Sequence, residues 1–249
     1  MKLAEVALVM PVFNEVDGIL TFLQEIDNEF RDLVVIIVDD FSTDSTARAV
    51  SDFTPQNVTI RLVKNDQNKG HGPTTLRALK EGLGSGAGVV VASDGDGQVS
   101  AQDLRRMLTE FQSTNCDVLV GVRIGRKESV FRVVTSWVTR VITGVRSHKR
   151  ILDANTPFRV YSSAALTDLL EIVPRESMVP NLWMTVIGQR SLLDVRFTLV
   201  NARDRLGISP VGSTWGRGVR VLPSRRFVKF CLLATVEWFG AWRNVRSRL

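Results

Sequence analysis

The stretch Gly88-Val89-Val90-Val91-Ala92-Ser93-Asp94-Gly95-Asp96-Gly97-Gln98 places a short apolar run directly before two acidic residues. The run predicts a strand over Gly88–Ser93, and strands of this near-continuous apolar kind are buried on both faces of a parallel sheet. Ligands of such sheets bind beyond the carboxyl ends of the strands. We therefore expect Asp94, Asp96 and Gln98 to lie at a binding edge of a sheet.

Strands and helices alternate through the first half of the chain. Apolar runs predict further strands over Val6–Val12, Leu33–Asp39, Thr59–Val63 and Asp117–Val122. Amphipathic periodicity predicts helices over Val16–Phe30, Ser45–Phe53, Pro73–Gly84, Ala101–Ser113 (with Ser100 as its N-cap) and, later, Ala164–Ile172. This alternation predicts an α/β, Rossmann-like three-layer fold, in which helices flank a mostly parallel central sheet.

The length and composition are those of one main domain. The chain has 249 residues, of which 44% are apolar, and this suffices for one substantial core. We expect one domain over residues 1–215, which divides into a first half (1–122) and a second half (123–215), and a basic amphipathic tail over 216–249. Cys116 and Cys231 lie far apart and indicate neither a disulfide framework nor a zinc site, so a reducing cytosol fits best.

Two carboxylates separated by one glycine can both face a single cation. Asp94 and Asp96 have this spacing, and Gln98 adds an amide oxygen. An all-oxygen set favours Mg²⁺ or Mn²⁺ over zinc. Such a cation would offset the charge of a nucleoside diphosphate that departs when its sugar is transferred. An isolated Asp-x-Asp is more often a solvated turn, so the position after a buried strand carries this prediction.

Polar residues also follow the earlier strands. Either Asp39 or Asp40, at the end of the second strand, can accept hydrogen bonds from a base and a ribose; the alternative is that Ser42 or Asp44 merely caps the next helix. In the glycine-rich loop 65–73, Lys69 and backbone amides could meet phosphate or ribose. For His71 in that loop, a local partner explains its presence at least as well as catalysis does.

Four segments in order resemble the successive motifs of family 2 glycosyltransferases, which have the GT-A fold. They are Val9-Met10-Pro11-Val12-Phe13-Asn14-Glu15, Val38-Asp39-Asp40-Phe41-Ser42-Thr43-Asp44, Asn68-Lys69-Gly70-His71-Gly72 and Asp94-Gly95-Asp96-Gly97-Gln98. Two later segments, Gly121-Val122-Arg123 and Asp153-Ala154-Asn155-Thr156-Pro157-Phe158-Arg159-Val160-Tyr161, resemble the branch with dolichyl- and polyprenyl-phosphate sugar transferases. Phe41 and Pro157 depart from the pattern, because the family usually has glycine at both positions.

The resemblance implies an inverting transfer of a sugar from a nucleoside-diphosphate sugar to a polyprenyl phosphate. It makes residues 1–215 the catalytic domain, with 1–122 as its nucleotide-binding half and 123–215 as its acceptor-side half. The nucleotide-binding residues that it implies are Pro11, Phe13, Asn14, Glu15, one of Asp39 and Asp40, Lys69, Gly70 and Asp94. The implied metal ligands are Asp94, Asp96 and Gln98. The implied phosphate-binding residues of the acceptor side are Arg123, Arg132, Ser136 and Arg205.

The kind of acceptor decides which groups must be catalytic. A phosphate monoester has a second pKa of about 6, so it is already anionic at neutral pH and needs positioning, by Arg123 for instance, rather than a strong base. A hydroxyl acceptor on a glycan or lipid would instead need a carboxylate base, for which Asp153 is the candidate. Asp96 would serve either reaction through the cation.

Three other classes compete with this interpretation. A haloacid-dehalogenase-type phosphatase also has strand-Asp-x-Asp-Gly, but there the motif opens the fold, whereas three strand–helix units precede Asp94 here. A membrane-surface module without catalysis would not need Asp94, Asp96 and Gln98 together. Nucleic acid is disfavoured despite the sequence pI of about 9.8, because aromatic stacking platforms are absent from the sequence.

The basic residues are concentrated in two amphipathic segments. Apolar residues recur at helical spacing among arginines over 130–145 and again over 227–242. The second run is too short and too charged to span a bilayer, and we see no secretion signal. These segments predict peripheral attachment of a cytoplasmic enzyme to the cytoplasmic face of an anionic membrane. The alternative is that both helices pack on the core or against a second subunit of a homo-oligomer.

Overall fold

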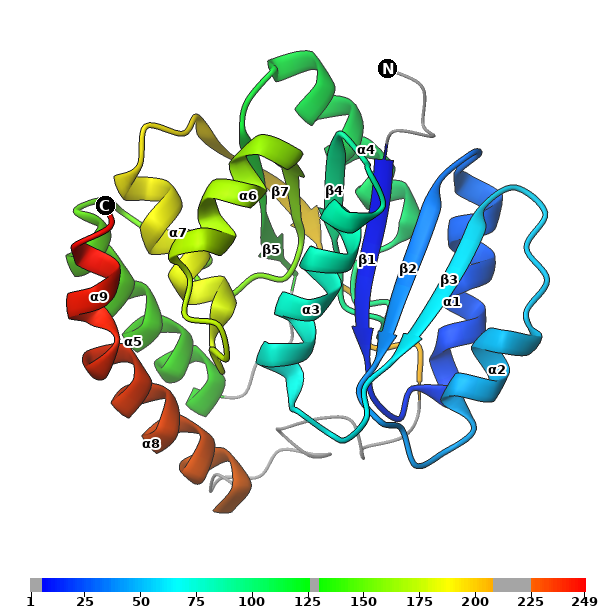
Figure 1. Cartoon of the computed structure of the whole chain (residues 1–249), viewed down its shortest axis with the longest axis horizontal. Helices are drawn as coiled ribbons and strands as arrows, with labels where there is room; N and C mark the ends of the chain where they lie inside the picture. Colours follow the sequence, from blue (N-terminus) through cyan, green and yellow to red (C-terminus); the bar gives the residue numbers. More distant parts are fainter. Residues whose placement is uncertain (1–5, 126–129, 208–224) are drawn as a thin grey trace.

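The computed structural model describes residues 6–125, 130–207 and 225–249, which form one seven-stranded sheet with helices on both faces (Figure 1). The strands are β1 (Val6–Val12), β2 (Val34–Asp39), β3 (Thr59–Lys64), β4 (Val89–Ala92), β5 (Val118–Ile124), β6 (Arg159–Ser162) and β7 (Val195–Asn201). The helices are α1 (Val16–Glu29), α2 (Thr46–Asp52), α3 (His71–Gly84), α4 (Ala101–Thr114), α5 (Val130–Ser147), α6 (Ser163–Ile172), α7 (Pro180–Arg190), α8 (Arg225–Gly240) and α9 (Trp242–Arg246).

The strand order across the sheet is β3-β2-β1-β4-β6-β5-β7. β1 pairs in parallel with β2 and β4, and β3 pairs in parallel with β2. β6 runs antiparallel to β4 and β5, and β7 is parallel to β5. The first four strands therefore end at one common edge of the sheet, which is where the predicted polar residues lie.

An apolar core covers each face of the sheet. Leu8 of β1 shares the first core with Phe22 of α1 and Met107 of α4. Val9, which points to the other face, shares the second core with side chains of α3, α6 and α7. Trp238 of α8 also belongs to this second core, so the C-terminal helices pack on the sheet domain through one side.

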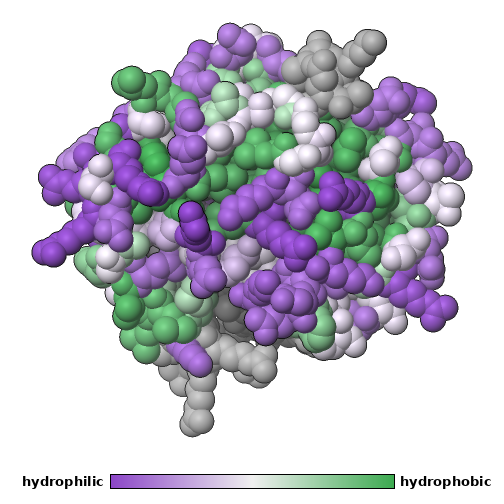
Figure 2. All heavy atoms as spheres, viewed as in Figure 1, coloured by the Kyte–Doolittle hydropathy of each residue, from purple (hydrophilic) through white to green (hydrophobic). Residues whose placement is uncertain are grey.

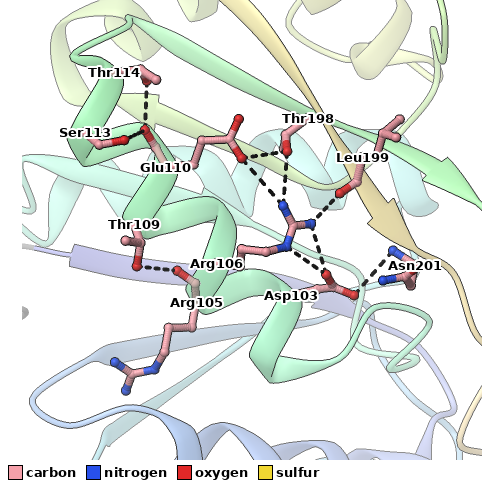
Figure 3. A network of polar contacts seen from close by, with 10 residues as sticks. All are labelled: Asp103, Arg105, Arg106, Thr109, Glu110, Ser113, Thr114, Thr198, Leu199 and Asn201. Carbon is pink, nitrogen blue, oxygen red and sulfur yellow. Dashed lines mark hydrogen bonds and ion pairs between the residues drawn. The ribbon is translucent and has the colours of Figure 1, made fainter.

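Arg106 ties α4 to the edge strand β7 (Figure 3). Its guanidinium donates to Asp103 at 3.0 Å, to Thr198 at 3.2 Å and to the carbonyl oxygen of Leu199. Thr198 in turn donates to Glu110 at 2.7 Å. The network fixes the end of β7, from which the chain returns to the ends of the first strands.

The predicted alternation of strands and helices is confirmed, with every predicted boundary within two residues of the observed one. Ser100 caps α4 as expected, because its side chain accepts a hydrogen bond from the Asp103 amide at 3.1 Å. The sequence did not predict β6, α7 or β7. β6 has four residues inside a polar segment, and α7 is buried on nearly all sides, so it lacks the two-sided pattern that marks a surface helix.

Within the described parts of the chain, none of the helices has both the length and the apolar character needed to cross a bilayer.

Candidate functional site

The ends of β1, β2 and β4 meet at one edge because the three strands are parallel neighbours. Val12 lies opposite Asp39, and Val9 lies opposite Ala92. The pairing continues past the strands: the Asp40 amide donates to the Val12 carbonyl at 2.9 Å, and the Ser93 amide to the Val9 carbonyl at 3.1 Å. The predicted polar residues after these strands are thus brought together.

Asn14 joins the loop after β1 to the loop after β2. The backbone amide of Asn14 donates a hydrogen bond to Ser42 Oγ at 3.0 Å, and its side-chain oxygen accepts one from the backbone amide of Thr43 at 2.8 Å. The Ser42 hydroxyl contacts the Asp39 carboxylate, which is buried. Phe41, where the family usually has glycine, has a positive φ of 62°, so the loop keeps the left-handed backbone that glycine favours.

Asp40 holds the glycine-rich loop. Its buried carboxylate accepts the amides of Lys69 and Gly70, both at 2.8 Å, and Asn65 Nδ2 at 2.7 Å. The two amides expected to meet phosphate or ribose therefore donate within the protein. The loop leads into His71, the first residue of α3.

Asp94 and Asp96 lie in the loop after β4. Gly95 is needed between them, because a Cβ there would lie 2.4 Å from Val12 Cγ1. Asp94 Oδ1 is buried without a hydrogen-bond partner among the described residues, and His71 Nε2 lies 3.7 Å from it. Burial and the charge of Asp94 raise the pKa of Asp96 to about 6, against the opposing effect of Arg205.

These carboxylates fit a divalent cation. Their mutual repulsion would be relieved by a positive ion, and the buried oxygen of Asp94 would gain a partner. Among the described residues, His, Cys, Asp and Glu side chains do not gather in a cluster of three that could hold a metal. The protein would therefore supply Asp94, Asp96 and the half-buried Gln98, with diphosphate and water oxygens completing the shell, as is usual for Mg²⁺.

The segment 202–207 returns from β7 and covers this loop. The Arg203 amide donates to the Gln98 carbonyl at 2.9 Å, and the Leu206 amide to the Asp96 carbonyl at 3.1 Å. The Arg203 side chain donates to Glu25 at 2.6 Å and 2.9 Å. Gly97 has φ 67°, and a Cβ there would lie 2.5 Å from Leu206 Cδ1. Sequence reasoning missed this cover, apart from the single residue Arg205.

Arg205 lies between two carboxylates of the site. It contacts Glu15, and its Nε lies 3.5 Å from Asp96 Oδ2. Burial raises the pKa of Glu15 to about 7; Arg205 opposes this shift, whereas Asp96 and Asp94 add to it. The guanidinium therefore offsets part of the negative charge that is concentrated here.

Arg123, at the end of β5, binds Asp153 with two hydrogen bonds. Nε lies 2.7 Å from Oδ2, and Nη2 lies 2.9 Å from Oδ1. The loop that carries Asp153 is fixed by Arg159, which is fully buried and donates to the carbonyls of Thr156 and Asn181 at 3.0 and 2.9 Å. Sequence reasoning gave Arg159 no role, because a buried arginine bound by backbone carbonyls leaves no signal in a single sequence.

The remaining predicted residues lie on the same elements. Pro11 is buried at the end of β1, and Phe13, just beyond it, is half-buried. Ser136 is half-buried in α5, where its carbonyl accepts the Thr139 hydroxyl at 3.0 Å. Arg132 belongs to the same helix, but its side chain lies outside the described residues.

The sheet order, with two aspartates after β4, agrees with the GT-A type of glycosyltransferase that the sequence resemblance implies. Residues 7–170 match the model of glycosyl transferase family 2. The chain belongs to this family and is a glycosyltransferase.

Curated relatives come from the polyprenyl-phosphate branch. A dodecaprenyl-phosphate galacturonate synthase of Rhizobium johnstonii is 24% identical over 215 residues, 84% of this chain and 62% of that protein. A UDP-N-acetylglucosamine–dolichyl-phosphate N-acetylglucosaminyltransferase of Methanococcus voltae is 27% identical over 181 residues, 66% of this chain and 72% of that protein. The chain thus spans less than two thirds of the first relative.

Solved structures show the same fold. Glucosyl-3-phosphoglycerate synthase from Mycobacterium tuberculosis, in complex with phosphoglyceric acid, superposes with a TM-score of 0.67 at 15% identity, covering 95% of this chain and 79% of that one. The complex of that enzyme with Mn²⁺ and UDP-glucose gives a TM-score of 0.63 at 16% identity, covering 94% and 79%. At these identities, the likeness establishes the fold alone.

Proposed function

We propose that this glycosyltransferase moves a sugar, with inversion, from a nucleoside-diphosphate sugar to a polyprenyl phosphate, and that it needs Mg²⁺ or Mn²⁺. The observation that carries the proposal is the pair Asp94 and Asp96 at the edge where β1, β2 and β4 end. The names of the curated relatives support the acceptor class. The Mn²⁺ and UDP-glucose complex of a protein with this fold supports the donor class and the cation.

The donor's base and ribose would lie over the ends of β1 and β2. Pro11, Phe13, Asn14 and Glu15 would form one side of this site. Of the two aspartates, we assign the hydrogen-bonding role to Asp39. Among the described residues its carboxylate accepts hydrogen bonds from Ser42 alone, whereas Asp40 already accepts three from the 65–70 loop.

The diphosphate would lie over the β4 loop. The cation held by Asp94, Asp96 and Gln98 would offset the charge that develops on the departing diphosphate. Arg205 would contribute a second positive charge from the covering segment, next to Asp96. His71, 3.7 Å from Asp94, lies where it can contact the same group.

The acceptor phosphate would bind on the side of Arg123, Arg132 and Ser136. An anionic phosphate needs orientation rather than deprotonation, and the two-pronged contact with Asp153 fixes the plane of the Arg123 guanidinium. The same contact disfavours the second candidate, a hydroxyl acceptor with Asp153 as base, because both Asp153 oxygens already accept hydrogen bonds from Arg123.

We place the reaction at the cytoplasmic face of an anionic membrane. α5 exposes Val133, Trp137, Val138, Val141 and Val145, and α8 exposes Leu232, Leu233, Val236 and Phe239. Figure 2 shows hydrophobic side chains gathered at the lower left of the molecule, over α8. Exposed basic residues lie on the same helices or just after them in the sequence: Lys149, Arg150, Lys229, Arg243, Arg246 and Arg248. Apolar and basic side chains in this mixture suit an anionic lipid surface.

Part of the apolar stripe that was expected to face lipid packs on the domain instead. Trp238 is 3% exposed, and its ring lies 4.4 Å from that of Trp183 in α7. Ile142, Phe230 and Trp242 also pack against the second core. One face of each helix therefore packs on the domain, and the exposed face remains for lipid.

A two-stage experiment tests the proposal. Calorimetric titration with UDP, GDP and dTDP, each with and without Mn²⁺, identifies the base and the metal requirement. Transfer from the matching nucleotide sugar is then measured onto polyprenyl phosphate and onto polyprenol. We expect metal-dependent nucleotide binding and transfer to the phosphate alone. Transfer to polyprenol at a comparable rate would establish the hydroxyl-acceptor reaction instead.

A further inference from the structure

Glu237 is the only acidic residue of the sequence after Asp204, within a segment rich in arginine. In the structure it points from α8 toward the domain, and among the described residues its carboxylate has no ion pair with an arginine. Its carboxylate accepts hydrogen bonds from the Ser177 hydroxyl at 2.5 Å, the Met178 amide at 2.7 Å and Trp183 Nε1 at 2.8 Å. Three neutral donors around one carboxylate form strong, charge-assisted hydrogen bonds that specify the position of the turn at Ser177.

The turn at residues 177 and 178 is pressed against the first turn of α3. A Cβ at Gly72 would lie 2.3 Å from the Ser177 carbonyl oxygen and 2.6 Å from the Met178 carbonyl carbon. The backbone of the turn therefore packs directly on Gly72 with no room for a side chain between them, and a shift of the turn toward α3 would displace the start of the helix. Ser177 is 1% exposed, which shows that the contact is fully enclosed.

The first turn of α3 is part of the donor side of the site. His71 at its start lies 3.7 Å from Asp94, and the amides of the two preceding residues bind Asp40. The start of α3 is therefore held from two sides: by Asp40 at the end of β2, and by the turn that Glu237 holds.

We propose that Glu237 is a positioning residue for the donor site: through Ser177, Met178 and Gly72 it sets the start of α3, and with it His71 beside Asp94. The C-terminal helix that carries Glu237 thereby becomes a requirement for tight binding of a nucleoside diphosphate. This inference rests on the proposed function, because it takes the site near Asp94 to be the nucleotide site.

The test compares Glu237→Gln with Val245→Ala. Glu237→Gln keeps the size of the side chain, and Trp238 would still anchor α8; but an amide has one oxygen where the carboxylate has two, so it cannot satisfy the same three donors. Val245 of α9 is 2% exposed in the same apolar core, and its hydrogen bonds go to Ala241 and Arg248 rather than to the 177–178 turn, so its truncation measures loosening of that interface.

We expect Glu237→Gln to raise the Kd for the nucleotide and the donor KM roughly tenfold, the effect of one lost hydrogen bond to a charged group. The acceptor KM should stay unchanged. Glu237→Asp, which keeps the charge, should recover part of the affinity. Val245→Ala should lower the Tm by at least as much as Glu237→Gln and leave the Kd within about twofold, that is about 0.4 kcal/mol.

Two outcomes decide the inference, and both use the wild-type protein as reference. If wild type binds UDP, GDP or dTDP and Glu237→Gln binds with the same Kd, or if Val245→Ala weakens binding equally, Glu237 has no positioning role. If wild type binds none of the nucleotides, the proposed donor site is wrong, and the inference is overturned with it. His71→Ala provides an independent check, since its loss should reduce the effect of Glu237→Gln in a double-mutant cycle.

Discussion

Arg123 and Asp153 form a two-pronged ion pair, with Nε 2.7 Å from Oδ2 and Nη2 2.9 Å from Oδ1. Both side chains are largely withdrawn from solvent, with 11% and 16% of their surfaces exposed. Such pairs fix the plane of the guanidinium group. The contact supports the proposal that Asp153 acts through Arg123, and experiment can separate this role from that of a base.

The first prediction is a non-additive double-mutant cycle. Arg123→Ala should lower kcat/KM for the acceptor roughly 10- to 100-fold and leave the nucleotide Kd nearly unchanged, because a charged hydrogen bond is worth about 1.5–3 kcal/mol. Asp153→Ala should cause a similar loss in wild type and little further loss in Arg123→Ala. Asp153 would instead be the base if the losses in the two single variants added in the double variant and if the pH dependence of kcat in Asp153→Ala differed from that of wild type.

The exposed pair Asp194 and Arg196 offers a matched control for this cycle. It has nearly the same geometry, 2.8 Å between Nη2 and Oδ2, but about half of each side chain is exposed. Asp194→Ala should leave both kcat/KM for the acceptor and the nucleotide Kd unchanged. If Asp194→Ala lowered kcat/KM as much as Asp153→Ala, the loss in Asp153→Ala would reflect the change in net charge and not the contact with Arg123.

The second prediction concerns the cation. Asp96→Ala should reduce transfer at least about 100-fold, the order expected when a charge-stabilising group is removed, and leave the protein folded. Asp94→Ala should behave similarly, and Gln98→Ala more mildly, because a neutral amide contributes less to a divalent site. Activity of Asp96→Ala within threefold of wild type would contradict the metal assignment, as a threefold change is under about 1 kcal/mol.

Thermal unfolding gives a second measurement of the metal site that does not depend on turnover. A cation that binds only the native state stabilises it by RT ln(1 + c/Kd), where c is its free concentration, so the Tm rises with the logarithm of that concentration once the site is saturated. We expect Mn²⁺ with a nucleoside diphosphate to raise the Tm of wild type but not that of Asp96→Ala. Asp52→Ala, which removes an exposed carboxylate of α2 outside the site, should keep the wild-type response.

The parts that the sequence could predict are those whose cause is local. Buried strands such as Val34–Asp39 carry an unbroken apolar run, and the polar residues after them fall at one edge because parallel strands end together. The cover formed by residues 202–207 could not be found this way. Its anchor, the bidentate contact of Arg203 with Glu25, joins residues 178 positions apart and depends on how β7 is placed.

Asp40 shows a second limit of prediction. The sequence correctly indicated that two acids end β2, but not that Asp40 would be occupied by the amides of Lys69 and Gly70. Motif spacing places a carboxylate at the edge of the sheet. Its hydrogen-bond partners depend on the path of a loop some thirty residues later, which periodicity does not encode.

The third prediction is a pH-dependent loss of stability in Asp27→Asn. Asp27 is 2% exposed, and its carboxylate accepts the amides of Gln56, Asn57 and Val58 at 3.0, 2.8 and 3.1 Å. Burial alone would raise the pKa of Asp27, but these amides lower it below its usual range. The variant should lose roughly 2 kcal/mol of unfolding free energy at pH 7, because its neutral amide binds the same donors more weakly.

The sign of the pH effect follows from the lowered pKa. Above the unfolded-state pKa of about 3.9 the native carboxylate is fully charged, and its stabilisation is complete. As the pH falls through the lower native pKa, the native carboxyl takes up its proton and the stabilisation is lost. Urea titrations should therefore show the difference between wild type and Asp27→Asn shrinking below about pH 4. Asp52→Asn, at an exposed site, should differ little from wild type at any pH.

The last prediction tests the membrane surface formed by the exposed faces of α5 and α8. Trp137 and Phe239 are 59% and 68% exposed, so neither is needed to fill a core. Burying one such side chain in lipid contributes about 1.5–3 kcal/mol, and each basic residue near an anionic surface about 1 kcal/mol. Wild type should float with liposomes in proportion to their anionic lipid content, and salt should weaken this binding. Trp137→Ser with Phe239→Ser should bind at least about tenfold more weakly.

Leu20 supplies the control for this flotation experiment, because it is an exposed apolar residue of α1, which lies across the molecule from α5 and α8 (Figure 1). Leu20→Ser should bind liposomes like wild type, since its side chain lies outside α5 and α8. Binding that ignores lipid charge, or no binding at all, would assign the exposed faces of the two helices to contacts between copies of the chain. Sedimentation of the Trp137→Ser and Phe239→Ser variant would then reveal a loss of oligomer.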